Sequence, residues 1–177
     1  KRSMMKGSLV KGLMAITILL MLPLSAKATG QTGDIIYIDG EKWSLLGKPL
    51  NYDDELYTKL NEFLPTDREW STANWSGYTG CWEIVYGRLY LKKVMVYMYD
   101  KILKKHYEIT YDAYDLKELF APYYTVHGIS AEWYSNKDVT AGRGECIRVI
   151  NDAYDRNYAD ELVMTFEKGE VVKEEYW

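Results

Sequence analysis

Two glutamates that neighbour tryptophans give the strongest hint of catalysis in this sequence. Glu83 follows Trp82, and Glu132 precedes Trp133. A glycoside hydrolase needs two carboxyl groups, one acting as acid and the other as base or nucleophile, on either side of a bound sugar. Adjacent residues of a β-strand point to opposite faces, however, so neither carboxylate needs to touch its neighbouring ring. The adjacency alone therefore does not predict a catalytic pair.

A nucleophile beside a histidine is the second chemistry that the composition allows. The chain has two histidines, His106 and His127, and two thiols, Cys81 and Cys146. These types can form a Cys–His pair, but no nucleophile elbow surrounds them. The chain also has no phosphate-binding glycine loop, dinucleotide fingerprint, H-E-x-x-H or C-x-x-C motif. We therefore predict no catalytic residue, no metal site and no cofactor.

The cysteines have a structural interpretation as well. An even number of cysteines in an exported protein favours a disulfide, and a Cys81–Cys146 bond would close a loop of 65 residues. A loop of that length corresponds to about 4 kcal/mol of stabilisation in the chain-entropy model. Because spacing in sequence cannot show that two thiols are close in space, two independent free cysteines remain the alternative.

The first 28 residues have the form of a secretory signal peptide. Basic residues precede an apolar run at 13–24, and the small residues Ser25, Ala26 and Ala28 follow it. We expect cleavage after Ala28, with an uncleaved anchor as the alternative. The sequence thus predicts a periplasmic or secreted protein with no stable membrane insertion, whose residues 29–177 form one domain.

Removal of the leader makes the chain strongly acidic. Five of the 22 Lys and Arg residues lie in the leader, which leaves 17 against 26 Asp and Glu residues, a net charge of −9. Such a domain should be repelled by nucleic acid and by anionic lipid, and it suits a partner protein with a basic surface. Solubility is the simpler explanation of the same charge.

Most of the secondary structure that positions the candidate residues is predicted to consist of β-hairpins. Apolar alternation flanks three turns that contain glycine, at Asp39-Gly40, Gly87 and Lys168-Gly169. In the central hairpin the alternation shifts by one residue at Lys92-Lys93, which predicts a β-bulge or a new strand. We expect shorter turns at 136–138 and 141–144 and a loop at 151–160.

Two helices are expected beside the sheet. Residues 52–64 carry apolar side chains at helical spacing, with Asn51 as N-cap and Pro65 as terminator. Residues 112–120 predict a short second helix. The fold class is therefore α+β, with a mainly antiparallel β-sheet built from hairpins and a polar linker at 66–72.

Aromatic residues supply the candidate binding surface. The chain has 17 Tyr and 6 Trp, types that combine apolar area with a polar group and are enriched at protein interfaces. Period-2 alternation assigns Trp82, Ile84 and Tyr86 to the core. The candidates for partner binding are Trp75 and Tyr78, which precede this alternation, together with Tyr123 and Tyr124.

Several segments resemble a known group of proteins. They include 75–78, 82–84, 87–91, 131–135, 161–162 and 166–169. They resemble uncharacterised small proteins, secreted or periplasmic, of Bacteroidetes-type bacteria, some of which look like immunity proteins of polymorphic toxin systems. The resemblance implies a toxin-neutralising role and brings no catalytic residues with it. This chain departs from the pattern after Trp133, where Asn136-Lys137 replaces a glycine-ended turn.

Together these observations favour an exported, non-enzymatic binding protein. A carbohydrate-binding module is the alternative that uses the same aromatic residues, which would then stack on a glycan. A small hydrolase of the cell envelope is the alternative that uses the histidines and carboxylates.

Overall fold

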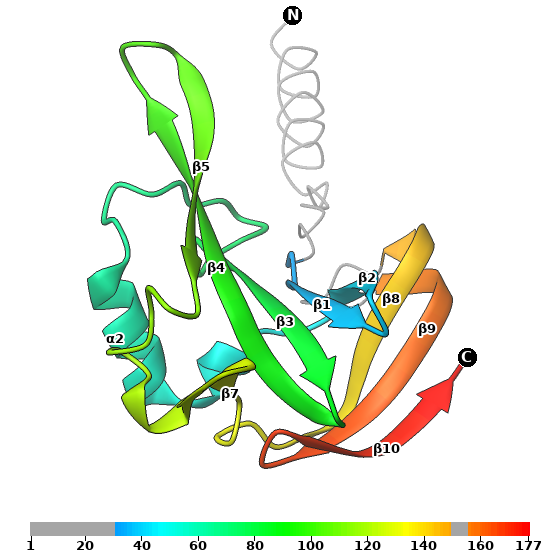
Figure 1. Cartoon of the computed structure of the whole chain (residues 1–177). Coiled ribbons are helices and arrows are strands. Elements are labelled where there is room, and N and C mark those ends of the chain that lie inside the picture. The colour runs from blue at the N-terminus through cyan, green and yellow to red at the C-terminus, as the bar shows by residue number, and fades with distance from the viewer. Residues whose placement is uncertain (1–30, 150–155) are drawn as a thin grey trace, which may run out of the picture.

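The computed structural model describes residues 31–149 and 156–177, and in this part of the chain a ten-stranded sheet is accompanied by one α-helix and two 3-10 helices (Figure 1). This architecture is α+β, as the sequence predicts. The leader at 1–28 lies outside the described residues. The strands are β1 Asp34–Ile38, β2 Glu41–Leu45, β3 Thr79–Val85, β4 Arg88–Asp100, β5 Lys105–Asp112, β6 Tyr124–Thr125, β7 Gly128–Ser130, β8 Asn136–Val149, β9 Arg156–Glu167 and β10 Glu170–Tyr176.

Three hairpins have the turns that the sequence predicts. Both central residues have positive φ in Asp39-Gly40 (51° and 80°), Tyr86-Gly87 (51° and 74°) and Lys168-Gly169 (46° and 77°). Positive φ at both positions defines the type I′ turn, whose twist matches that of the flanking strands. Tyr86 therefore occupies a turn and is 93 % exposed, so its assignment to the core was wrong.

One strand pair is parallel, and the sequence did not reveal it. β1 runs beside β3 in the same direction, with Ile35 opposite Cys81 and Ile36 opposite Trp82. Parallel neighbours require a crossover connection. Here the crossover runs through β2, the 3-10 helix η1 (Pro49–Tyr52) and the helix α2 (Asp54–Phe63). Because the two strands are parallel, their first residues lie at the same edge of the sheet.

The helix α2 is close to the prediction but begins later. Asp53, rather than Asn51, is the N-cap, and its Oδ1 accepts a hydrogen bond from the Leu56 amide at 2.9 Å. Pro49 starts η1 just before it, so Asn51 belongs to that turn. Leu56 and Leu60 are buried and attach the helix to the core.

The predicted helix at 112–120 is wrong. This segment is a series of turns that leads into the 3-10 helix η2 (Ala121–Tyr123). The Asp112 Oδ1 atom accepts hydrogen bonds from the amides of Tyr114 and Asp115, at 2.8 and 2.9 Å. Such local side-chain bonds compete with helix formation. Leu116 and Phe120 are nevertheless fully buried, so the apolar periodicity reported burial correctly.

The phase shift in β4 is confirmed as a bulge. Cys81 pairs with Lys93, and Trp82 pairs with Leu91, so Lys92 is the additional residue. Beyond the bulge β4 pairs with β5 along eight residues, from Lys93 opposite Asp112 to Asp100 opposite Lys105. Figure 1 shows that the end of this β4–β5 hairpin projects away from the rest of the molecule.

The C-terminal half is more regular than expected. The predicted turns at 136–138 and 141–144 lie inside the long strand β8, where the register with β9 shifts. Asp138 and Gly144 have φ of 54° and 82° at these irregularities. Pairing with β9 keeps the chain extended, so turn-type residues form bulges instead. Residues 156–160 of the predicted loop belong to β9, and 151–155 lie outside the described residues.

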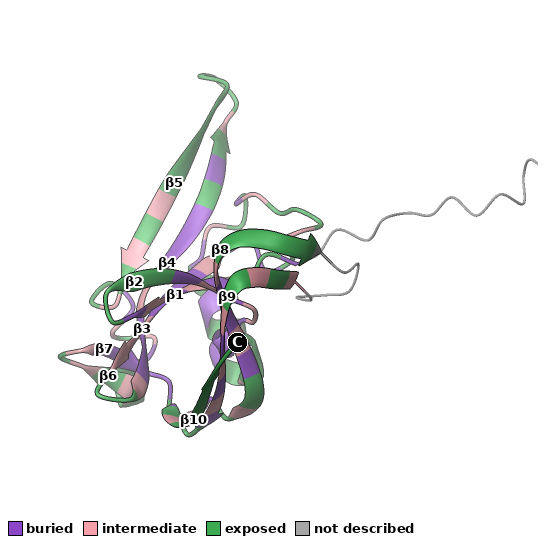
Figure 2. Cartoon of the chain, turned by 90° about the vertical axis from the view of Figure 1, so that its right-hand side faces the viewer, coloured by how far each residue is buried: buried purple, intermediate pink, exposed green. Residues whose placement is uncertain are grey.

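The core cluster combines buried side chains of the sheet with Leu56 and Leu60 of α2, whereas β5 and β10 have no buried residue, as Figure 2 shows for β5. Trp82, Leu89, Leu91 and Ile129 are fully buried. A single pairing of Glu170 in β10 with Arg88 in β4 connects one end of the sheet path to an interior strand. In the described residues, no helix is long and apolar enough to cross a membrane.

Candidate functional site

A cleft of about 560 Å³ opens where β1 and β3 begin. Its lining comes from segments that are far apart in sequence: the start of β1, strands β2, β3, β4 and β9, and the segment 69–74. Three aromatic side chains and three charged ones are prominent in it. They are Trp70, Tyr97, Tyr158, Lys42, Glu69 and Arg156.

Trp70 is fixed from behind by a buried arginine. The Arg68 guanidinium lies 4.3 Å from the Trp70 ring centre, and Arg68 is only 4 % exposed. Its nitrogens donate hydrogen bonds to the Pro65 carbonyl (3.0 Å) and the Asn61 amide oxygen (2.5 Å). Burial lowers the pKa of Arg68 from its usual value, although arginine stays charged at neutral pH. Trp70 itself is 53 % exposed, so it presents a rigid aromatic surface to the cleft.

The Trp70 segment is also attached to the β4–β5 hairpin. The Glu69 amide donates a hydrogen bond to the Tyr97 carbonyl at 2.7 Å. The Glu69 carboxylate lies 2.9 Å from Nδ1 of His106, whose ring packs against Tyr99 at 4.9 Å. These contacts place the Tyr97 ring, which is 44 % exposed, on the same cleft as Trp70. Burial, followed by a hydrogen bond with Glu108, raises the pKa of Tyr97, so its hydroxyl stays protonated.

Tyr158 owes its position to a missing side chain. A Cβ atom on Gly142 of β8 would come within 2.0 Å of the Tyr158 ring on β9. Glycine at 142 therefore lets the ring lie across the neighbouring strand and reach the cleft. The glycine at 142, which the sequence suggested as part of a turn, has this packing role instead.

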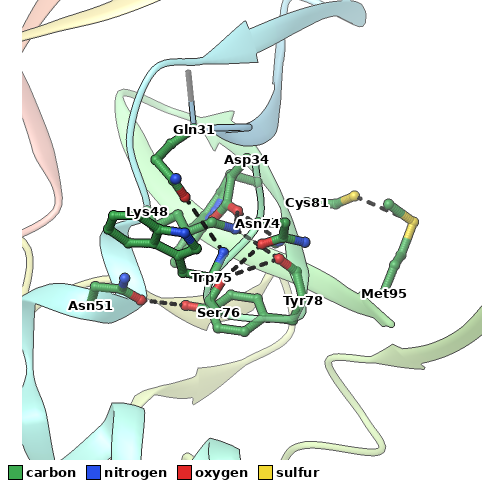
Figure 3. A network of polar contacts seen from close by, with 12 residues as sticks. Gln31, Asp34, Lys48, Asn51, Asn74, Trp75, Ser76, Tyr78, Cys81 and Met95 are labelled. Carbon is green, nitrogen blue, oxygen red and sulfur yellow. Dashed lines mark hydrogen bonds and ion pairs between the residues drawn. The ribbon is translucent and has the colours of Figure 1, made fainter. Parts of the chain in front are cut away.

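A buried ion pair supports the floor of the cleft (Figure 3). Asp34, 1 % exposed, accepts hydrogen bonds at Oδ1 from Lys48 Nζ (2.9 Å) and the Gly80 amide (3.0 Å). Its Oδ2 accepts one from Trp82 Nε1 at 2.8 Å. Lys48 also donates to the Tyr78 carbonyl at 2.7 Å. The pair joins the starts of β1 and β3 to the segment before α2, so it fixes the edge of the sheet at which the cleft forms.

Trp75 and Tyr78 separate in the structure. Trp75 is 69 % exposed, and its amide lies 3.5 Å from the Gln31 side-chain oxygen. Tyr78 is fully buried, and its hydroxyl donates a hydrogen bond to Asn51 Oδ1 at 2.7 Å (Figure 3). The expectation of a surface role for Tyr78 is therefore wrong. Its position just before β3 places it between the sheet and the Lys48 segment, which local sequence does not show.

Tyr123 and Tyr124 lie elsewhere. Tyr123 is half-buried, with its ring 5.1 Å from Trp133, whereas Tyr124 is 39 % exposed on β6. Tyr123, Glu132 and Trp133 line a second hollow of about 810 Å³ together with residues of β4 and the C-terminal hairpin. None of the four predicted binding residues lines the first cleft.

The predicted disulfide does not form. Both cysteines are free: Cys81 is buried in β3, and Cys146 is exposed on β8. The Cys81 thiol packs 3.9 Å from the Met95 sulfur, and Cys146 lies 3.6 Å from the Arg148 carbonyl. Burial raises the pKa of Cys81 to about 11, so it stays a protonated thiol at neutral pH and is a poor nucleophile.

The other chemistry-bearing residues are dispersed. Glu83 pairs with Lys92 at 3.2 Å, and only Glu132 lines the second hollow, so the two carboxylates do not share a pocket. His106 contacts Glu69, and the His127 ring packs against Tyr86 and Tyr90. Within residues 31–149 and 156–177, no group of three or more His, Cys, Asp or Glu side chains could hold a metal ion.

Sequence reasoning missed Trp70, Arg68 and Tyr158. Trp70 and Arg68 fall in the segment 66–72, which was interpreted as a polar linker. Their spacing of two residues carried a signal, because residues i and i+2 of an extended chain share a face and can stack. Tyr158 had no such signal, since only the pairing of β8 with β9 brings it to Gly142.

Comparison of the chain with known protein families, with curated proteins and with solved structures gives no match. The resemblance to small exported bacterial proteins therefore stays a prediction. The fold and the cleft define the molecule as an α+β protein with an open cleft lined by aromatic and charged side chains.

Proposed function

We propose that the protein is an exported, non-enzymatic binding protein that holds an extended segment of a partner protein in the cleft. The observation that carries this proposal is the position of the Trp70 ring. The guanidinium of buried Arg68 stacks on this ring, and the ring lines the cleft. An aromatic side chain that is already immobilised loses little conformational entropy on binding, which favours affinity. Trp and Tyr are also the residue types most enriched at interface hot spots.

Charges of both signs favour a polypeptide over a neutral glycan. Lys42 on β2 and Arg156 on β9 line the cleft, and so does Glu69. A peptide segment offers backbone amides and side chains of either charge, so it can complement a cleft wall that carries charges of both signs. A neutral glycan would stack on the rings of Trp70 and Tyr97 and form hydrogen bonds with the charged side chains, but it carries no charge of its own to complement theirs. A carbohydrate-binding module is therefore the second candidate.

The expected leader and the net charge complete the proposal. A signal peptide at 1–28 would deliver the chain to the periplasm or the exterior. The net charge of −9 after its removal would speed association with a basic partner protein. A toxin that this chain neutralises is one such partner, in line with the resemblance to immunity proteins.

Two binding measurements test this proposal. A phage-displayed library of random peptides is selected on the purified protein, and the product of the adjacent gene is titrated against it by calorimetry. Trp70→Ala should weaken binding by about 10- to 100-fold, the effect of a hot-spot residue. Tyr114→Ala is the matched control, because Tyr114 is 62 % exposed and lies outside the cleft.

The outcomes separate the candidates. Peptide or protein binding that Trp70→Ala weakens supports the proposal. Glycan-array binding that depends on Trp70, without peptide binding, would replace it with the carbohydrate-binding alternative. Partner binding that is insensitive to both Trp70→Ala and Tyr97→Ala would refute the assignment of the cleft.

A further inference from the structure

The tip of the β4–β5 hairpin exposes two aliphatic side chains without any cover. Ile102 is 91 % exposed and Leu103 is 67 % exposed, and both lie in the turn at 101–104. The Asp100 side chain orders the turn: its Oδ1 atom accepts hydrogen bonds from the backbone amides of Ile102 (2.8 Å) and Leu103 (2.9 Å). An ordered turn presents the two side chains outward in a fixed arrangement.

The charge of the tip is opposite to that of the protein. Lys101, Lys104 and Lys105 are all exposed, and Asp100 is the one acidic residue between positions 100 and 105. The chain after residue 28 carries −9 overall. An average over the sequence therefore hides a local cationic site that anionic surfaces attract.

Tyrosines follow behind the lysines. Tyr99 on β4 is 43 % exposed, and Tyr107 on β5 is 47 % exposed. In the hairpin Tyr99 is opposite His106 and Tyr107 is opposite Met98, so the two rings lie on opposite faces of it. The tip thus has aliphatic residues at its end, lysines around them and tyrosines behind. Side chains at a membrane interface are arranged in the same order, with tyrosines at the level of the headgroups.

We propose that the tip of the β4–β5 hairpin docks the protein reversibly on an anionic lipid surface, with Ile102 and Leu103 at the boundary between the headgroups and the acyl chains. Two aliphatic side chains on an isolated turn are too few for a stable protein interface, which buries roughly 800 Å² on each partner. Shallow insertion of a few apolar side chains, assisted by lysines, is typical of interfacial binding. The proposal is independent of the function assigned to the cleft.

The length of the hairpin also reduces the repulsion between anionic lipids and the acidic remainder of the protein. The last backbone bond from the 69–74 segment to β4 is at Tyr97, and Ile102 lies five residues beyond it. The three strand residues beyond Tyr97 span roughly 10 Å, slightly more than the screening length of about 8 Å at physiological salt. Acidic residues of the body behind Tyr97 are therefore partly screened from the lipid charges when the tip is at the surface, so net charge alone mispredicts this contact.

Vesicle co-sedimentation tests the proposal. The purified protein, with removal of the leader verified by mass spectrometry, is mixed with vesicles of phosphatidylcholine alone or with phosphatidylglycerol. It should bind the mixed vesicles more tightly, and added salt should weaken that binding. Ile102→Ser with Leu103→Ser should reduce binding roughly ten-fold or more. Replacing the three lysines by Gln should reduce it about 100-fold, near five-fold for each lysine.

Matched controls come from other exposed positions. Val126→Ser removes an aliphatic side chain that is 95 % exposed in the turn between β6 and β7, and Lys137→Gln removes an exposed lysine on β8. Neither should change vesicle binding. Because all tip substitutions are at exposed positions, circular dichroism should show an unchanged fold. Failure of the unsubstituted protein to bind mixed vesicles, or equal binding by the tip variants, would overturn the proposal.

Discussion

Among single substitutions that remove a charge near the cleft, loss of Lys48 should reduce the free energy of unfolding the most. In Lys48→Met the buried Asp34 carboxylate keeps only the Gly80 amide and Trp82 Nε1 as donors, and the Tyr78 carbonyl loses its bond from Nζ. Breaking a buried ion pair from one side leaves an uncompensated charge and costs about 3–5 kcal/mol. A domain has about 5–15 kcal/mol of stability, so this is a large fraction of it.

Urea denaturation followed by tryptophan fluorescence measures this loss. With a denaturant slope of about 2 kcal/mol per M, the unfolding midpoint should fall by roughly 2 M. Asp34→Asn combined with Lys48→Met should be more stable than Lys48→Met alone, because the double variant leaves no buried charge and keeps an acceptor near Gly80 and Trp82. That recovery separates an electrostatic cause from lost packing.

Lys59→Met is the control for the same chemical change at the surface. Lys59 pairs with Glu55 at 2.6 Å on the exposed side of α2, and exposed pairs contribute little. Its midpoint should stay near that of the unsubstituted protein. A loss of less than about 1 kcal/mol in Lys48→Met, or a double variant that is less stable than Lys48→Met, would contradict an electrostatic role for this buried ion pair.

Two further predictions concern the cleft wall and the thiols. Gly142→Ala should destabilise the fold by about 1–3 kcal/mol, because the new methyl group collides with the Tyr158 ring. Thermal unfolding should show that the double variant Gly142→Ala with Tyr158→Ala is no less stable than Tyr158→Ala alone. A further loss of stability in the double variant would contradict the steric cause. Alkylation of the native protein at pH 8, followed by peptide mass spectrometry, should modify the exposed Cys146 and leave Cys81 unmodified. Burial raises the pKa of Cys81 to about 11, so its unreactive thiol form persists at this pH. Recovery of a Cys81–Cys146 cross-linked peptide would show instead that the disulfide forms.

Local interactions explain what the sequence could predict. The type I′ turns at Asp39-Gly40, Tyr86-Gly87 and Lys168-Gly169 depend on residues that tolerate positive φ, and all three hairpins formed there. The bulge at Lys92 was visible because one additional residue reverses the alternation of every side chain beyond it. The apolar spacing of Leu56 and Leu60 likewise predicted the buried face of α2.

Burial of single aromatic residues was harder to predict. Tyr78 and Trp75 are three residues apart in a segment without alternation, yet one is fully buried and the other is 69 % exposed. The difference comes from Lys48 and Asn51, which lie across the Tyr78 side chain and backbone. Similarly, Asp112 closed a turn at a position where apolar periodicity predicted a helix.

By itself, the sequence determined the hairpins, the main helix, the acidic balance and the absence of familiar catalytic motifs, because each depends on neighbouring residues or on composition. Only the tertiary structure decided that Cys81 and Cys146 stay apart, that Trp70 stacks on Arg68 in a cleft, and that the tip of the β4–β5 hairpin projects away from the rest of the molecule. The physical reason is that each of these features depends on contacts between distant segments, and for the cleft the decisive contact is the parallel pairing of β1 with β3. This contact between residues more than forty positions apart sets where the cleft forms, and no local pattern specifies it.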